Sequence, residues 1–564
     1  MEGKPEGLDA VLPVREERLF LLLSIFIGVI SGLLVVSFRM AIEWLSVLLR
    51  GPAPGPHQLR LLAAPALAGI VIAVLTRYVF PGVKGSGVNQ TKAALYIHNG
   101  YISTRTVIGK FMLAALAIGS GQSLGPEDPS LQIGAGVASL ISRKIGLSRE
   151  RLRIFAPVGA AAGLAAAFNA PISAILFVIE EVIGQWTAGV LGSVVLSAVS
   201  AVVVARWFWG ASPMFRIPSV DLRDPRELMA YAALGLVGGV ASLGFAKALG
   251  YLRPLMRSQP QWFQIMQPAL AGLLVGGIGY FGLPQVMGAG YGAIDLAMHG
   301  QFALKMLLLL AVFKIIATTL SFSSGTPGGM FAPTLFTGAM LGAAVGSFEH
   351  HFFPVLTGSE GSYALVGMGV LFAAFLRAPL TSVFMVLEVS GNYSIVLPVI
   401  LANTIAYLIS RSLQPIPIFE MFTHQDGLYL PSMEEEREET DLRVEDALKE
   451  VTTPIVPGTQ SVGAARQNLM KAEDAREVLV QCSDGSWYAA LRDELLGMTA
   501  NEETALEDAL GVERTPRIYP DQALETTLGY FGRWPLLPIS NRARLGALEG
   551  VVSQEDVLRR YRER

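Results

Sequence analysis

Two glutamates stand out as candidates for chemistry because apolar or glycine-rich sequence surrounds them. Glu127 lies between Pro126 and Pro129 at the start of a predicted helix, and Glu181 follows Glu180 at the end of a long apolar run. A carboxylate inside a membrane span is costly and marks a functional site by default. When ionised, Glu127 could occupy an anion site, and when protonated it could leave. We therefore predict that Glu127 acts both as a gate and as a proton carrier.

Three glycine-rich segments interrupt the apolar sequence, at residues 85–89, 125–129 and 325–333. Each precedes a predicted helix, so each can present free backbone N–H groups at a helix N-terminus, which attracts anions. Partial charges of this kind suit transport, because a transported ion must also leave its site easily. Close helix packing at small residues is the alternative explanation for each segment taken singly.

The elements that position these residues are predicted to be membrane helices. The chain has 564 residues, of which 52% are hydrophobic and 16% charged, against about 25% charged in soluble proteins. A helix needs roughly 20 apolar residues to cross the bilayer core, and uncharged runs of that length occur at residues 19–38, 154–179, 184–205 and 315–348. We expect an integral membrane protein.

Several other classes of protein and site are disfavoured. Cys482 is the only cysteine, so an intramolecular disulfide is excluded. There is no basic run suited to nucleic acid, and none of the six histidines has metal-ligand spacing. We expect no metal, no nucleic-acid partner and no cofactor in the membrane domain.

The composition changes sharply near residue 425, where an acidic segment follows the last apolar run. We predict an N-terminal cytoplasmic segment and a transmembrane domain, followed by an acidic linker and a soluble domain. Their boundaries are residues 1–18, 19–425, 426–441 and 442–564, respectively.

Both predicted domains contain internal repeats. Residues 170–173 followed by Glu180 recur 208 residues later as 378–381 followed by Glu388. Transporters often have duplicated halves, with a substrate site of broken helices between them. We assign Glu388 no functional role beyond that of a structural partner, and solvation at a helix end is the alternative to a functional role for Glu180.

A second motif pair in the membrane domain, residues 129–135 and 333–339, has an offset of 204 residues. The tail repeats as well, with residues 444–454 matching residues 506–516. Each tail unit is predicted to contain a short helix, a strand, a second helix and further strands. Ser553 is the predicted N-cap of the final helix.

An enzyme alternative rests on Ser123, which is the central residue of a G-x-S-x-G pattern at residues 121–125. In serine hydrolases this pattern requires a strand before the serine and an α/β sheet around it. Here an apolar helical segment precedes Ser123, so the sequence favours a protein that is not an enzyme.

With these motifs in this order, the chain resembles the CLC family of chloride channels and proton-coupled anion transporters. The resemblance covers nearly the whole chain and is carried by residues 85–88, 119–129, 168–171 with 180–181, and 328–333. It implies an all-α integral membrane domain built as an inverted repeat of broken helices, followed by a soluble α/β domain that resembles a CBS pair. It also implies a homodimer in the cell membrane, multi-pass, with both termini cytoplasmic.

The resemblance also implies roles for particular residues. Ser86, in the loop with Gly85 and Gly87, would donate its hydroxyl to a central chloride ion, and the backbone amides of Met330 and Phe331 would line the same pathway. Glu127 would be the external gating glutamate.

Glu181 would be the internal proton-transfer glutamate. The presence of both Glu127 and Glu181 favours an H⁺/Cl⁻ antiporter. A passive chloride channel of the same fold, gated by Glu127 alone, is the alternative.

The chain departs from the family pattern at four positions. Pro126 and Asp128 replace an arginine and a glycine beside the gate, and Asp128 adds a negative charge next to Glu127. Asn89 stands where selectivity is tuned. Phe419 stands where a tyrosine hydroxyl usually completes the central anion site, so we expect weaker anion binding there.

In the CBS-like tail, Ser553 and Asp556 match a pattern that contacts the ribose of adenine nucleotides. Adenine nucleotide is therefore the one candidate ligand besides the transported ions. A purely structural dimerisation domain is the alternative.

Overall fold

The computed structural model describes residues 14–184, 188–215, 224–353, 358–428, 430, 442–472, 475–511, 513–541 and 547–562. Most of the predicted N-terminal segment, 1–13, and of the predicted acidic linker, 431–441, lies outside the described residues.

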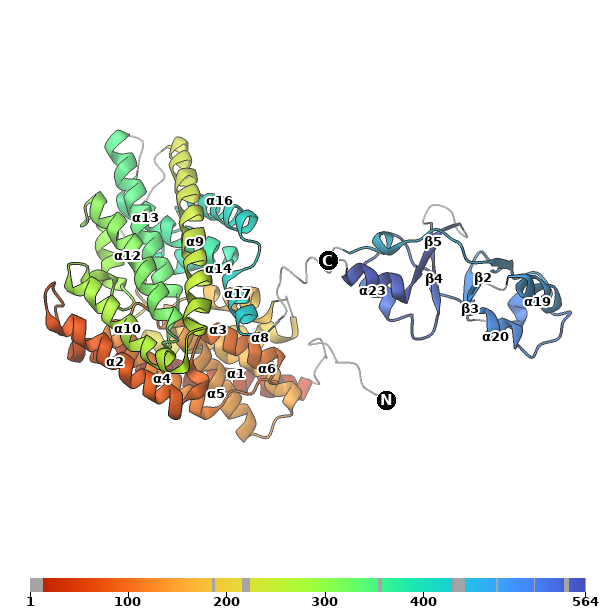
Figure 1. The fold of residues 1–564 in the computed structure, drawn as a ribbon, viewed down its shortest axis with the longest axis horizontal. Coiled ribbons are helices and arrows are strands. Elements are labelled where there is room, and N and C mark those ends of the chain that lie inside the picture. Colours follow the sequence, from red (N-terminus) through yellow and green to blue (C-terminus); the bar gives the residue numbers. More distant parts are fainter. Residues whose placement is uncertain are drawn as a thin grey trace. The chain divides into compact units, whose positions relative to one another are not determined.

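The chain forms two compact units, Met1–Ser432 and Met433–Arg564. Figure 1 shows that the first is built of helices and that the second carries the strands. The boundary falls within the segment 426–441 that we predicted to be a linker. Asp426, at the start of that segment, belongs to the first unit, where Arg253 binds it at 2.8 Å.

Apolar helices dominate the first unit, and nine of those in the described residues are long and apolar enough to cross a membrane. α1 begins at Val14, before the start predicted at Leu19, because the charged residues that precede the apolar run are themselves good helix formers. The helices are α1 (Val14–Arg50), α2 (Leu59–Tyr78), α3 (Gly87–Tyr96), α4 (Thr104–Ser120), α5 (Glu127–Lys144), α6 (Arg149–Phe168), α7 (Pro171–Phe177), α8 (Ala188–Trp209), α9 (Leu228–Arg257), α10 (Gln261–Tyr280), α11 (Tyr291–Met298), α12 (Leu304–Ser323), α13 (Phe331–Phe352), α14 (Glu360–Leu376), α15 (Pro379–Ser390), α16 (Val396–Leu413) and α17 (Ile418–Gln425).

Two of the long uncharged runs are broken rather than continuous helices. The run 154–179 breaks at Asn169, which has a left-handed φ of 56°, and α7 restarts at Pro171. Asparagine tolerates the left-handed conformation, and proline is favoured at the first position of a helix. The run 315–348 breaks likewise between α12 and α13. These breaks place helix ends inside the unit.

The repeated halves contact each other twice at their glycine-rich loops, with donor and acceptor exchanged. Gly125 N–H donates to the Gly329 carbonyl at 2.8 Å, and Gly329 N–H donates to the Gly125 carbonyl at 2.8 Å. A pair of this kind between equivalent residues is what a two-fold relation between the halves requires. It brings the loop before α5 against the loop before α13.

The second reciprocal contact involves the repeated glutamates. Glu180 accepts hydrogen bonds from Leu380 N–H at 3.2 Å and from Thr381 N–H and hydroxyl at 3.0 and 2.6 Å. Glu388 accepts the equivalent bonds from Ile172 and Ser173 of α7. Each glutamate therefore caps the broken helix of the other half. The structural role of Glu388 is confirmed, and the alternative of simple solvation for Glu180 is wrong.

Glycines serve two different purposes in this unit. A Cβ on Gly134 of α5 would lie 2.1 Å from the Gly159 carbonyl of α6, and one on Gly338 of α13 would lie 2.2 Å from the Gly367 carbonyl of α14. These glycines allow close helix packing. Gly85, by contrast, has a φ of +84°, and a Cβ there would meet nothing within 4 Å, so this glycine shapes the loop before α3.

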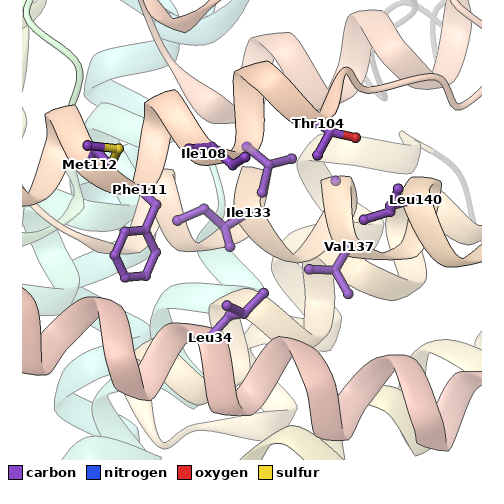
Figure 2. A pocket seen from close by; sticks show the side chains of 10 residues that line it. Leu34, Thr104, Ile108, Phe111, Met112, Ile133, Val137 and Leu140 are labelled. Atoms are coloured by element: carbon purple, nitrogen blue, oxygen red, sulfur yellow. The ribbon is translucent and has the colours of Figure 1, made fainter.

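An apolar cavity of about 300 Å³ lies between α1, α4 and α5. Figure 2 shows its lining side chains, which include Leu34, Phe111, Ile133 and Val137. Thr104 contributes the hydroxyl at its edge. The cavity has no charged lining residue, and it is not part of the site described below.

The second unit contains two small sheets. β1 (Ile455–Pro457) pairs in parallel with β2 (Glu477–Gln481), which pairs antiparallel with β3 (Trp487–Leu491). β4 (Leu536–Ser540) and β5 (Leu548–Ser553) form an antiparallel pair. The helices are η5 (Val444–Ala447), α19 (Val462–Lys471), α20 (Arg492–Leu496), α21 (Leu506–Ala509), α22 (Glu525–Leu528) and α23 (Gln554–Arg562).

The predicted repeat of the tail is visible in the order of these elements. The short helices η5 and α21 open the two halves, and Ile518 bridges in parallel to Ile539 much as Ile455 of β1 pairs with Leu479 of β2. The tail ends with β5 running into α23, where Ser553 Oγ accepts the N–H of Asp556 at 3.3 Å. The predicted N-cap is therefore confirmed.

Candidate functional site

Glu127 is the first residue of α5 and is completely buried. The Tyr291 hydroxyl, from the start of α11, donates a hydrogen bond to Glu127 Oε1. Glu127 Oε2 has no hydrogen-bond partner among the described residues. A Cβ on Gly125 would lie 2.4 Å from Glu127 Oε2 and 3.0 Å from the backbone nitrogen of Ala332 in α13. The carboxylate therefore lies where the loops before α5 and α13 meet.

The neighbouring carboxylate, Asp128, is held by α3. Asp128 Oδ2 accepts the Ser86 hydroxyl at 3.0 Å, and Asp128 Oδ1 accepts the Val88 N–H at 2.8 Å. Ser86 is the N-cap of α3 and also accepts the Val88 N–H on its own hydroxyl oxygen, at 3.1 Å. The hydroxyl that the family resemblance assigns to a central anion is therefore donated to Asp128 in this structure.

The predicted backbone donors of the pathway lie at the start of α13. Met330 is the N-cap and Phe331 the first residue of this helix, and both are fully buried. The first N–H groups of a helix have no partner within it, so they are available to a carboxylate or an anion. The Phe331 ring packs against Phe177 and Phe372, with centroids 4.9 and 5.6 Å apart.

Phe419 belongs to the same aromatic wall, with ring centroids 6.4 Å from Phe331 and 6.3 Å from Phe177. Its carbonyl accepts a hydrogen bond from Asn89 Nδ2 at 2.9 Å. Position 419 thus contributes an apolar ring in place of a hydroxyl. Asn89 positions the start of α17 in this structure, while its Oδ1 has no partner among the described residues.

Glu181 lies in a π-helical turn, η2 (Val178–Ile183), and is 8% exposed. Lys92 Nζ of α3 lies 3.2 Å from Glu181 Oε1. Turns of this kind are frequent at functional sites. Ser86, Asn89 and Lys92 are spaced three residues apart, so they lie on one face of α3. This face therefore makes both the contact with Asp128, through Ser86, and the ion pair with Glu181, through Lys92.

Tyr291 binds Glu127 and Lys92 binds Glu181, and neither partner was predicted from the sequence. Two fully buried lysines at equivalent positions of the repeat were not predicted either. Lys110 Nζ donates to the Gly85 carbonyl at 2.8 Å, and Lys314 Nζ donates to the Gly288 carbonyl at 2.7 Å. Each lysine thereby holds the loop before α3 or α11. A charged residue within an apolar helix was the signal that could have revealed them.

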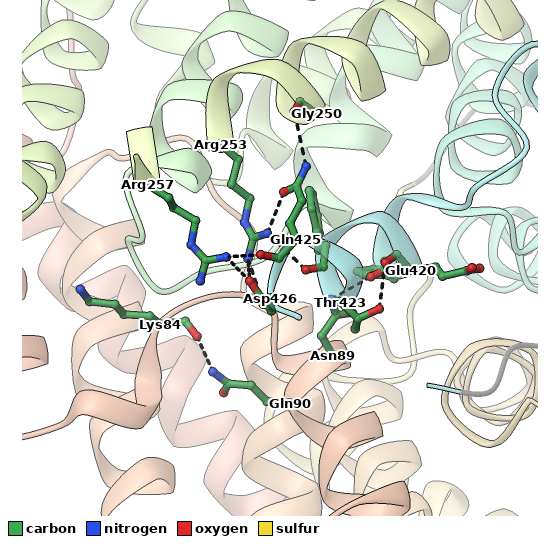
Figure 3. Close-up of polar contacts among 12 residues, drawn as sticks. Lys84, Asn89, Gln90, Gly250, Arg253, Arg257, Glu420, Thr423, Gln425 and Asp426 are labelled. Carbon is green, nitrogen blue, oxygen red and sulfur yellow. Dashed lines mark hydrogen bonds and ion pairs between the residues drawn. The ribbon is translucent and has the colours of Figure 1, made fainter. Parts of the chain in front are cut away.

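A polar network holds the end of α17, as Figure 3 shows. Arg253 of α9 binds both carboxylate oxygens of Asp426 at 2.8 and 3.1 Å, and Arg257 forms an ion pair with the same carboxylate. A pocket of about 170 Å³ beside Gly85 is lined by these three residues and by the exposed Lys84, among others. Basic side chains therefore outnumber acidic ones next to the loop before α3.

In the second unit, Ser553 and Asp556, the two residues predicted to contact a nucleotide, bind each other. Ser553 hydroxyl donates to Asp556 Oδ2 at 2.6 Å, Lys449 forms an ion pair with Asp556, and Arg559 lies 3.1 Å from its Oδ1. Burial acts to raise the pKa of Asp556, but the bonds from Lys449 and Ser553 outweigh it and hold that pKa below its ordinary value. A ribose would have to displace these partners.

Ser123, the enzyme alternative, shares a hydrogen bond of 2.9 Å with the Thr318 hydroxyl of α12. It follows the helix α4 rather than a strand. The strand and surrounding α/β sheet that a hydrolase serine requires are therefore missing from the described surroundings of Ser123.

Comparison with known proteins identifies the family. Residues 68–411 match the family model described as voltage gated chloride channel. A putative chloride channel protein ClcB-like of Ralstonia nicotianae is 32% identical over 68% of this chain and 92% of its own length. The H(+)/Cl(-) exchange transporter ClcA of Vibrio campbellii is 31% identical over 72% of this chain and 89% of its own length.

Solved structures agree with these matches. A slow cyanobacterial Cl⁻/H⁺ antiporter has a TM-score of 0.67 and 26% identity, covering 74% of this chain and 99% of that one. A eukaryotic CLC transporter has a TM-score of 0.63 and covers 96% of this chain and 98% of that one; at 19% identity it shows the fold alone. The chain belongs to the CLC family of voltage-gated chloride channels and transporters. It is a multi-pass membrane protein and not an enzyme, so the hydrolase alternative is wrong.

Proposed function

We propose that this protein exchanges chloride, or a similar small anion, for protons across the cell membrane. The observation that carries the proposal is the buried Glu127 carboxylate at the meeting point of the loops before α5 and α13. A carboxylate is itself an anion, so it competes with chloride for the N–H groups at these helix starts. The names of the ClcA relatives and the cyanobacterial structure support the same activity.

The proposed cycle follows from this competition. Protonation of Glu127 removes its charge and lets it leave, and an anion then takes its place near the N–H groups of Met330 and Phe331. When the anion moves on, Glu127 gives up its proton and returns. Glu181, buried beside α3, is the proposed carrier of protons between Glu127 and the other side of the membrane.

The test is reconstitution into liposomes with a chloride gradient and a pH electrode outside. We expect the chloride gradient to drive protons uphill. Glu181→Gln should abolish proton movement and spare chloride, while Glu127→Ala should abolish proton coupling through loss of the gate. Chloride movement without any proton movement in the unmodified protein would contradict the proposal.

A passive chloride channel is the second candidate. Two observations favour it: Lys92 forms an ion pair with the proposed proton carrier Glu181, and Phe419 contributes no hydroxyl. If the liposomes show chloride movement alone, we expect Phe419→Tyr and Lys92→Gln to be the first variants to test for recovery of proton movement.

We also propose a homodimer with both termini in the cytoplasm. Apolar residues on α15 and α16 are exposed in the single chain, among them Leu380, Leu397 and Ile400. Such a surface faces either lipid or a partner subunit. The measurement is the mass of the detergent-solubilised protein, together with the accessibility of terminal tags in inside-out vesicles. A monomer that transports at full rate would contradict the dimer proposal.

For the second unit, adenine-nucleotide binding at Ser553 and Asp556 stays a prediction. Because Asp556 is already held by Ser553, Lys449 and Arg559, the contacts favour a structural role for this unit. We propose a CBS-like pair that contributes to assembly. An increase in thermal stability with ATP that disappears in Ser553→Ala would favour nucleotide binding instead.

A further inference from the structure

Two consecutive carboxylates at the start of α5 are directed to different helix ends. Glu127 lies against the loops before α5 and α13, and Asp128 is bound by the start of α3. A glycine at position 128 would have no side chain with which to make the second contact. The contact with α3 therefore depends on the Asp128 side chain.

The donors that Asp128 takes are the ones an anion would use at α3. They are the Ser86 hydroxyl and the Val88 N–H. Gly87 permits the approach, because a Cβ there would lie 2.4 Å from the Asp128 carbonyl oxygen and 2.8 Å from its Oδ1. A helix N-terminus binds a carboxylate and a free anion by the same partial charges. The two therefore exclude each other at this position.

Asp128 is not required as a cap for α3. The Val88 N–H already has the Ser86 hydroxyl oxygen as an acceptor at 3.1 Å. If the Asp128 carboxylate moved away, this N-cap would remain, and the Ser86 hydroxyl proton would become free to bind an anion. The Asp128 carboxylate is therefore a second acceptor that competes with an anion, and α3 does not need it as a cap.

We propose that Asp128 is a tethered competitor for the anion at the start of α3, and that an anion reaches Ser86 only when the Asp128 carboxylate moves away. The proposal rests on the proposed transport function, and it deepens that function by adding a second carboxylate to the gate. Glu127 then controls the site at α13, and Asp128 controls the site at α3.

The Asp128 side chain is completely buried, and its two hydrogen bonds to the start of α3 hold it in the position described. Lys110 on α4 donates its hydrogen bonds to the Val83 and Gly85 carbonyls of the loop before α3. On the side of the α13 loop, a Cβ on Gly329 would lie 2.4 Å from Asp128 Cβ, so the Gly329 backbone packs directly against Asp128. Glu127 is the adjacent titratable group on α5.

The experiment measures chloride affinity calorimetrically on the purified full-length protein for the unmodified chain and for Asp128→Gly, Ser86→Ala and the double variant. We expect Asp128→Gly to raise chloride affinity about tenfold, because it removes the competing carboxylate and frees the Ser86 hydroxyl. Ser86→Ala should cost little in the unmodified chain, where Asp128 occupies the hydroxyl. It should cost several-fold in the Asp128→Gly background.

Two further variants complete the experiment. Asp128→Asn keeps the size of the side chain and removes its charge, so it should raise affinity by a smaller factor, and it serves in place of Asp128→Gly if the glycine variant misfolds. Asp295→Asn removes a half-exposed carboxylate on α11 and should leave affinity unchanged. If neither Asp128 variant folds, Asp128 is structural and the proposal is overturned.

The outcomes separate this proposal from the proposed function. If Ser86→Ala costs the same in both backgrounds while the protein still exchanges chloride for protons, Asp128 is a fixed cap and only the present proposal fails. If the unmodified protein and Asp128→Gly neither bind nor move chloride, the proposed function fails and this inference fails with it.

Discussion

Glu127, Asp128 and Glu181 are buried in the membrane unit, and each is held by a different kind of partner. Tyr291 donates a hydroxyl to Glu127, the start of α3 donates to Asp128, and Lys92 forms an ion pair with Glu181. Leaving a buried carboxylate without a partner destabilises the folded protein by roughly several kcal/mol. The partners therefore decide how easily each carboxylate can move or change its charge.

The first prediction concerns Tyr291, which acts on the gate through Glu127. Tyr291→Phe removes the hydroxyl and keeps the ring, so the ionised carboxylate loses a hydrogen bond. Such a bond to a charged group contributes about 1.5–3 kcal/mol, and we expect chloride flux at neutral pH to rise by about tenfold or more. The measurement is chloride efflux from liposomes.

The matched control for Tyr291 is the Glu127→Ala background, in which the carboxylate is absent. There Tyr291→Phe should change chloride efflux little. An equal rise in both backgrounds would show that the tyrosine acts on the protein in some other way than through the gate.

At the scale of elements, the broken helices α7 and α15 depend on each other. Each begins at a proline and receives the glutamate from the end of the other, Glu180 or Glu388. The repeated Ser173 and Thr381 supply the hydroxyls for these contacts. The sequence repeat therefore encodes a pair of caps that join the two halves.

We predict that Glu180→Gln and Glu388→Gln lower the thermal stability of the solubilised protein by similar amounts. Loss of a helix cap costs about 0.5–2 kcal/mol, and each glutamate makes three such bonds, so we expect the upper end of that range. Glu43→Gln, an exposed change on α1, is the control and should have no effect. A large effect from one of the two glutamates alone would argue against reciprocal capping.

The junction of β5 and α23 in the second unit should depend on pH through Asp556. Its pKa is lower in the folded protein than its ordinary value, so its contribution to stability is present above about pH 4 and is lost as the pH falls through the folded pKa. Asp556→Asn should weaken hydrogen-exchange protection of residues 548–562 at pH 7. The difference from the unmodified protein should shrink below about pH 4. A difference that is constant with pH would contradict this assignment.

At the scale of the whole molecule, about three quarters of this chain is enough to match nearly complete relatives. The cyanobacterial antiporter is covered over 99% of its length by 74% of this chain, and the Vibrio transporter over 89% by 72%. The second unit, Met433–Arg564, forms its own compact body. Transport and the role of the tail should therefore be separable.

We predict that a chain ending at Ser432 still moves chloride in liposomes at a rate comparable to the full chain. The physical reason is that the residues of the proposed pathway lie in the membrane unit and make their described contacts there. The unmodified full-length protein, reconstituted in parallel, is the control. Loss of flux from a truncated protein that remains monodisperse would show that the tail is required for transport.

Much of this organisation is determined by local sequence. Apolar runs of bilayer length specify membrane helices whatever surrounds them. Proline and asparagine break those helices at fixed positions, and Ser553 caps α23 through a neighbour three residues away. Glu127 and Glu181 were recognisable as candidates from their positions within apolar or glycine-rich sequence. Lys110 and Lys314 carried the same signal, although neither was predicted to have a role.

The tertiary structure alone decided which group each carboxylate meets. Tyr291 reaches Glu127 across 164 residues of sequence, and Lys92 reaches Glu181 across 89. The sequence shows Asp128 as a negative charge beside Glu127, but only the packed structure shows that Ser86 and Val88 hold its carboxylate. The reason is geometric, since a buried carboxylate binds whichever donors the packed helices bring beside it. In this protein those donors are helix starts and side chains contributed by distant segments.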